Sequence, residues 1–157
     1  MGLQINVGDH VSSESDYVAV PPAWREMVRW ARTRANAIAR GTPSANTYFR
    51  GLPGGRTLTA LLADASIWIN YGPSLGGWGQ TDSVGGKEIA LGGLAFRTGR
   101  WSVLATMIHE LAHSNGAPGG ASQDAERAVL ACGLGSSSER RTGVDDPRTP
   151  FDPSIGG

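Results

Sequence analysis

Residues 103–113 constrain the fold more than any other stretch, because an apolar helical pattern there also contains three ionisable side chains. The apolar residues recur at helical spacing, at Val103, Leu104, Met107, Ile108 and Leu111. His109, Glu110 and His113 belong to the same pattern, and residues 115–118, Asn-Gly-Ala-Pro, favour a helix stop. Burying these three polar side chains is costly unless they are hydrogen-bonded or bind a metal.

The spacing of the two histidines predicts a metal site. Histidines at positions i and i+4 project from adjacent turns of one helix face, so both imidazoles can reach one ion. Glu110 follows the first histidine, where its carboxylate can reach a metal-bound water. This is the HExxH pattern. With zinc, it predicts an activated water with a pKa near 7, Glu110 as general base and a polarised substrate carbonyl. The alternative is a solvated helix face without metal.

The remaining patterns predict a compact α+β single domain, mainly helical, with a small sheet. A strand of this sheet is expected to precede the HExxH helix. Helical spacing or capping favours helices at 22–41, 57–65 and 123–133. Strand-like stretches occur at 66–71 and 88–91, whereas residues 72–86 carry six glycines and are expected to form a loop. The domain is expected to span 1–133, followed by an irregular Gly/Ser/Pro/Asp-rich tail at 134–157.

Composition narrows the functional classes. The formal net charge is zero, which offers no electrostatic argument for nucleic acid or an anionic membrane. Cys132 is the only cysteine, so no intrachain disulfide can form, and we expect it to lie in the core. No stretch has the pattern of a signal peptide or the roughly 20 apolar residues of a membrane span. The chain is therefore expected to be soluble, without nucleic-acid binding or membrane insertion.

Residues 101–133 resemble the zincin metallopeptidases. In that group an edge strand upstream of the zinc helix pairs with the substrate backbone, and residues 87–91 occupy the corresponding place. A metzincin would have a third histidine six residues after His113, but that position is Gly119. The resemblance therefore implies a zinc peptidase outside the metzincins. Tyr48 or Tyr71 could donate to the oxyanion as tyrosines do in some zincins, and the sequence does not choose between them.

Two carboxylates are candidates for the third zinc ligand. Asp124 stands eleven residues after His113, a spacing similar to that of the aspzincins. Glu126 resembles the gluzincin ligand on a second helix, although its gap of thirteen residues is shorter than usual in that group. A helical wheel places Glu126 on the apolar face and Asp124 about 160° away, which favours Glu126. The other acid would then orient a histidine, while the alternatives are an arginine pair for Glu126 and a helix-dipole charge for Asp124.

The segment GAPGGASQDAERAVLACG also resembles metallopeptidase toxin domains that bacteria append to secreted effectors. This resemblance implies delivery as effector cargo to the periplasm or cytoplasm of a target cell. Its partners would be a protein or peptide substrate, an immunity protein and a secretion-apparatus carrier. The alternatives are a zinc amidase acting on peptidoglycan stem peptides, and a non-catalytic binding module with a vestigial motif. His10 is isolated in the sequence and is expected to be a surface or hydrogen-bonded histidine.

Overall fold

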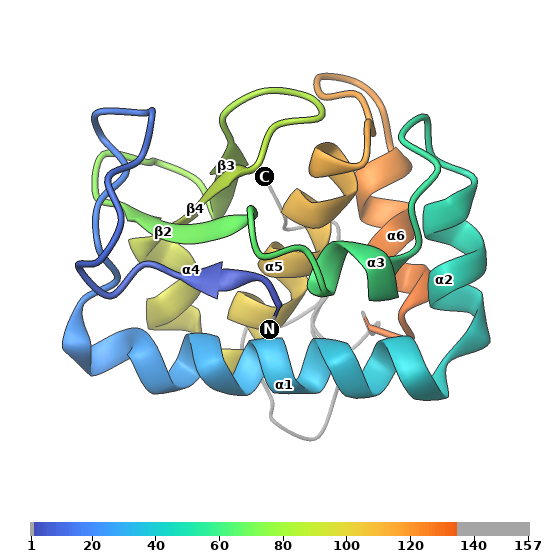
Figure 1. Cartoon of the computed structure of the whole chain (residues 1–157), viewed down its shortest axis with the longest axis horizontal. Coiled ribbons are helices and arrows are strands. Elements are labelled where there is room, and N and C mark those ends of the chain that lie inside the picture. Colours follow the sequence, from blue (N-terminus) through green and yellow to red (C-terminus); the bar gives the residue numbers. More distant parts are fainter. Residues whose placement is uncertain (1, 135–157) are drawn as a thin grey trace.

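The computed structural model describes residues 2–134 as helices around a small sheet, which confirms the predicted α+β class (Figure 1). Most of the tail predicted at 134–157 lies outside the described residues, and the domain boundary stays a prediction. The elements are β1 (Gln4–Ile5), a 3-10 turn (Pro22–Trp24), α1 (Arg25–Gly41), α2 (Pro43–Arg50), α3 (Leu58–Leu62), β2 (Trp68–Gly72), β3 (Gly79–Thr81), β4 (Glu88–Gly92), α4 (Gly93–Thr98), α5 (Arg100–Ser114) and α6 (Asp124–Ala131).

The sheet has the strand order β1-β2-β4-β3. β1, β2 and β4 run parallel, and β3 pairs antiparallel with β4. The central strands carry apolar residues in register, with Ile69 of β2 opposite Ile89 of β4, and both side chains fully buried. Such buried β-branched residues are typical of strands covered on both faces.

Helix α5 is the centre of the molecule, and residues 101–112 are all buried. It packs against α1, α4 and α6 and against the sheet strands β3 and β4. A helix with apolar residues on all its faces is stable only inside the core. The polar side chains of α5 therefore lie in the core because their apolar neighbours on the same helix are buried there.

The structure corrects three features of the predicted sheet and helices. The strand predicted at 88–91 is β4, which is an interior strand and not the edge. The edge strand that precedes the HExxH helix is β3, which lies inside the segment 72–86 predicted as a loop. Two short helices, α2 and α4, were missed. The missed elements β3, α2 and α4 begin at Gly79, Pro43 and Gly93, and glycine and proline at these positions favour a turn or loop over a regular element.

The other helices were predicted with small boundary errors. Helix α1 follows the 3-10 turn at Pro22, and α3 is shorter than the predicted 57–65. Helix α6 begins at Asp124 after Gln123, one residue later than the predicted start. The Ser122 hydroxyl accepts a hydrogen bond from the Asp124 backbone N–H, at 3.2 Å. No described helix is both long and apolar enough to cross a membrane.

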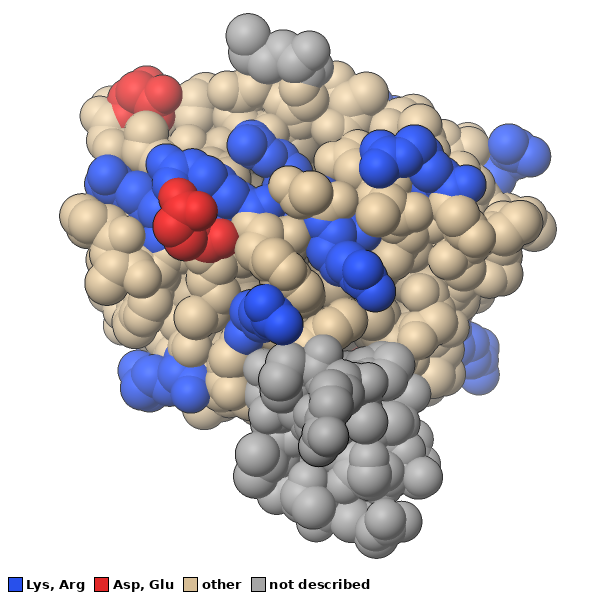
Figure 2. Space-filling view, turned by 90° about the horizontal axis from the view of Figure 1, so that it is seen from below, with Lys and Arg blue, Asp and Glu red and all other residues tan. Residues whose placement is uncertain are grey.

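Charge is spread unevenly over the molecule, although the formal net charge is zero. Figure 2 views the side on which α1 lies in Figure 1, and lysine and arginine outnumber acidic residues there. The charged residues of α1 are five arginines and one glutamate: Arg25, Glu26, Arg29, Arg32, Arg34 and Arg40. Zero net charge is therefore a weaker argument against anionic partners than the sequence suggested, and the absence of nucleic-acid binding stays a prediction.

Asn115 fixes the end of α5 to a neighbouring loop. Its buried amide nitrogen donates to the backbone oxygens of Phe49 and Arg56, both at 2.8 Å. Its amide oxygen accepts from the Arg56 N–H at 3.1 Å. The next residue, Gly116, has a φ of +91°, and a Cβ there would lie 2.9 Å from the Pro53 Cβ. Helix α5 ends at Ser114, and the chain turns at Asn115 and Gly116 towards α6.

Replacing Asn115 by alanine is expected to lower the free energy of unfolding by about 2–4 kcal/mol, because three backbone groups lose their partner. Chemical denaturation measures this change. Asn36→Ala is the matched control, since its partly exposed amide donates only to the Arg32 oxygen; it should cost less than about 1 kcal/mol. Equal losses for the two variants would contradict a special role for Asn115.

Candidate metal centre

The imidazoles of His109 and His113 project from the same face of α5, and their Nε2 atoms lie close together. Their Nε2 atoms are 3.2 Å apart, and their rings are inclined at 68°. Two zinc ligands at 2.0–2.1 Å in a tetrahedral arrangement would be separated by about 3.3 Å. The distance in the structure therefore fits two nitrogens that bind one ion.

Hydrogen bonding and burial leave both Nε2 atoms available as ligands. The Nδ1 of His113 lies 2.8 Å from the Ala117 backbone oxygen, which selects the tautomer with the proton on Nδ1. Burial, and secondarily the neighbouring His113, lower the pKa of His109 to about 4. His109 is therefore neutral near pH 7, as a metal ligand must be. Its Nδ1 is buried and has no hydrogen-bond partner among the described residues.

Glu110 lies beside the histidine pair and is almost completely buried. Its Oε1 accepts a hydrogen bond from the Thr81 hydroxyl at 2.9 Å, whereas its Oε2 has no hydrogen-bond partner among the described residues. Oε2 lies 3.9 Å from the His109 Nε2. Ligand atoms of His109, Glu110 and His113 all lie within 4.8 Å of one another. The three residues of the HExxH pattern thus form one buried cluster.

The environment of Glu110 disfavours its ionised form. Burial raises the pKa of its carboxyl to about 8; the Thr81 hydrogen bond opposes this rise, and the charge of Glu126 adds to it. A carboxyl with this pKa is mostly protonated at pH 7, but a divalent cation beside it would favour the ionised form. The donor set and the unpartnered oxygen therefore fit a zinc site.

A cleft of about 400 Å³ opens onto this cluster. Its walls come from β3, from the loop after β3, from α5 and from the turn after α5: Gly79, Gln80, Thr81, Ser83, Val84, Glu110, His113 and Gly119. Gly79 allows β3 to lie against α5, because a Cβ there would be 2.6 Å from Thr106 Cγ2. The loop is tied to the same helix, since the Gly85 N–H donates to the His113 oxygen at 2.9 Å.

The two candidates for the third ligand have different surroundings. Asp124 has a side chain that is 40% exposed and 3.9 Å from the Arg127 guanidinium, which agrees with a charge in the first turn of a helix. Glu126 has a buried Oε2 without a hydrogen-bond partner among the described residues. Glu126 does not belong to the three-residue cluster around His109. The third ligand therefore stays a prediction, with Glu126 in the more suitable environment.

The other candidate residues lie in contacts outside the cluster. The Tyr48 hydroxyl donates to the Asp124 backbone oxygen at 2.7 Å, and Tyr71 packs edge-on against Trp24. Cys132 is buried, which raises the pKa of its thiol to about 12 and agrees with the predicted core position.

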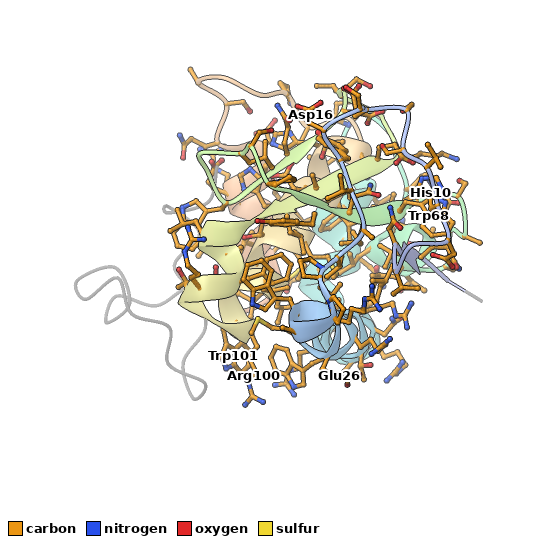
Figure 3. All side chains as sticks on the ribbon, turned by 90° about the vertical axis from the view of Figure 1, so that its left-hand side faces the viewer. His10, Asp16, Glu26, Trp68, Arg100 and Trp101 are labelled. Carbon is orange, nitrogen blue, oxygen red and sulfur yellow. The ribbon has the colours of Figure 1, made fainter. Side chains whose placement is uncertain are left out.

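His10 is hydrogen-bonded, as expected. Its Nε2 lies 3.0 Å from both carboxylate oxygens of Glu88. Its ring stacks on Trp68 with centroids 3.9 Å apart (Figure 3).

Sequence reasoning missed the residues that β3 adds to the site. Thr81 binds Glu110, and the Gln80 side-chain oxygen accepts a hydrogen bond from the Tyr17 hydroxyl at 2.9 Å. Tyr17 is buried, and this burial is the main cause that raises its pKa, followed by the charge of Glu14. These contacts join segments far apart in the sequence, so no local spacing could have predicted them.

The geometry therefore supports a metal site in a cleft beside an edge strand. The chain matches no protein-family model, no curated protein and no solved structure.

Proposed function

We propose that this chain is a zinc-dependent peptidase that hydrolyses peptide bonds with Glu110 as general base. One observation carries the proposal: a histidine pair with ligand nitrogens 3.2 Å apart lies beside a buried carboxylate with one unpartnered oxygen. Glu110 and His113 line a cleft that is bordered by a strand edge. A solvated helix face would not bury a glutamate and a histidine almost completely.

His109 and His113 would hold the ion through their Nε2 atoms, with Glu126 as the third ligand. Zinc would supply Lewis-acid chemistry, which polarises a carbonyl and makes water more acidic. Glu126 is preferred because its buried oxygen lacks a partner among the described residues, whereas Asp124 lies near Arg127. The Ala117 oxygen would keep His113 in the ligating tautomer.

Glu110 would move the protons of the reaction. Its ionised Oε2 takes a proton from the attacking water as the new carbon–oxygen bond forms. The same carboxyl then gives this proton to the departing amine nitrogen as the carbon–nitrogen bond breaks, so Glu110 returns to its starting form.

The edge of β3 would bind the substrate backbone. One side of β3 pairs with β4, and no strand among residues 2–134 pairs with its other side. Unpaired N–H and C=O groups on an edge strand can pair with an extended peptide. Gly79, Gln80 and Thr81 all line the cleft, so a peptide paired there would lie next to Glu110.

The setting in which the peptidase acts rests on the sequence resemblance alone. A toxin domain of a bacterial effector would have an immunity protein and a secretion carrier as partners. A zinc amidase of peptidoglycan stem peptides would share the metal and the base, so the substrate separates the two. A binding module with a vestigial motif would need neither metal nor Glu110.

Replacing Glu110 by glutamine should lower kcat by about 10²–10⁴-fold, because the amide cannot accept the proton. Hydrolysis is measured on casein and on purified cell-wall sacculi, with zinc content determined in parallel. Glu26→Gln on α1 is the control, since its side chain is 84% exposed, and it should keep full activity. A Glu110→Gln protein with unchanged kcat would refute the proposed base.

Replacing Glu126 by glutamine should weaken zinc binding by about 10- to 100-fold or more, because an uncharged amide is a poorer ligand. Asp124→Asn is the matched variant and should change the affinity by less than about threefold, since Asp124 lies by Arg127. Competition with a chromophoric chelator gives both dissociation constants. The reverse order would assign the third ligand to Asp124.

A further inference from the structure

Thr81 is the residue of β3 that contacts the proposed general base. Its hydroxyl oxygen lies 2.9 Å from Glu110 Oε1 and 3.1 Å from the Glu110 backbone oxygen. A threonine hydroxyl has one proton to donate, and an ionised carboxylate is the stronger acceptor. The carboxylate Oε1 is therefore the preferred partner when Glu110 is charged.

This contact makes the two carboxylate oxygens of Glu110 unequal. Oε1 is held by Thr81, whereas Oε2 has no hydrogen-bond partner among the described residues and lies 3.9 Å from His109 Nε2. A carboxylate with one fixed oxygen cannot turn its plane freely. The oxygen nearer the histidine pair is thus the one left to accept a proton.

We infer that Thr81 is a positioning residue, which holds Glu110 so that Oε2 faces the reacting water. This inference rests on the proposed function, because the water is defined by that reaction. It also assigns two tasks to one strand: β3 presents its free edge to the substrate and its Thr81 hydroxyl to the base. A substrate that pairs with β3 would therefore tighten the alignment of Glu110.

The surroundings keep Thr81 in place. Thr81 is opposite Ile89 of β4, which is fully buried. Two residues earlier, Gly79 permits the close approach of β3 to Thr106 on α5. Four residues later, the Gly85 N–H binds the His113 oxygen. The segment is thus fixed on both sides of Thr81, against the helix that carries Glu110.

The test uses Thr81→Val, which keeps the shape and removes the hydroxyl, and Thr81→Ser, which keeps the hydroxyl. Thr81→Val should lower kcat by about 10- to 100-fold, as expected when a catalytic group is misplaced. Its KM should stay within about twofold, and its zinc content should be unchanged. Thr81→Ser should recover kcat to within about threefold of the wild type. Thr98→Val is the control, because that hydroxyl donates to the Leu94 backbone oxygen on α4.

A second readout needs no activity. In metal-free protein, Thr81→Val should lower Tm by about 2–4 °C, and the loss should be smaller when Glu110 is already alanine. Such coupling shows that the two side chains interact directly. A merely structural role for Thr81 would lower Tm equally in both backgrounds.

Each of three results from the activity and zinc measurements would overturn the inference. They are an unchanged kcat in Thr81→Val, a Thr81→Ser variant as impaired as Thr81→Val, and a loss that appears in KM or zinc content instead of kcat. If the zinc-loaded wild type hydrolyses neither casein nor sacculi, the proposed function itself fails. An active wild type with no coupling between Thr81 and Glu110 refutes this inference alone.

Discussion

The structure depends on the burial of α5 with two ionisable side chains inside it. The apolar residues of this helix are almost all fully buried. His109 and Glu110 lie among them and are only 2% and 1% exposed. Burying neutral His109 and an underbonded carboxyl costs free energy that the apolar packing must offset. A fold that needed only stability would place an apolar residue at position 110, so the cost itself argues for a chemical role.

The sheet and α5 together define the cleft. Three parallel strands form the body of the sheet, and β3 adds an antiparallel edge that reaches the helix at Thr81 and Glu110. The close approach needs a glycine at position 79, since a side chain there would meet Thr106. The Gly-rich segment is therefore not simply a flexible connection, because Gly79 allows β3 to pack against α5 beside Glu110.

Local patterns predicted the parts of the molecule that depend on local spacing. The periodicity of α1, α5 and α6 covers several turns, and the His109–His113 pair needs only one helix face, so these features were found. The edge strand β3 has three residues, which are too few to show an alternating apolar pattern. It is a strand because it pairs with β4. Thr81 is 29 residues from Glu110, and its contact exists only after the sheet packs on the helix. The helical wheel favoured Glu126 over Asp124 as the third ligand. This choice stays a prediction, because coordination depends on a separation between two helices that spacing cannot supply.

Glu110 and Glu126 share a feature that bears on the candidate metal centre. Each has one buried carboxylate oxygen without a hydrogen-bond partner among residues 2–134, and the charge of Glu126 raises the pKa of Glu110. The nearby arginine of α6, Arg127, pairs with Asp124 instead. Positive charge beside Glu110 would offset this repulsion and favour the ionised form of its carboxyl. A divalent ion held by the histidines would supply this positive charge. The turn at Asn115–Gly116 leads the chain back to α6, so the same ion would connect both helices with the charge state of Glu110.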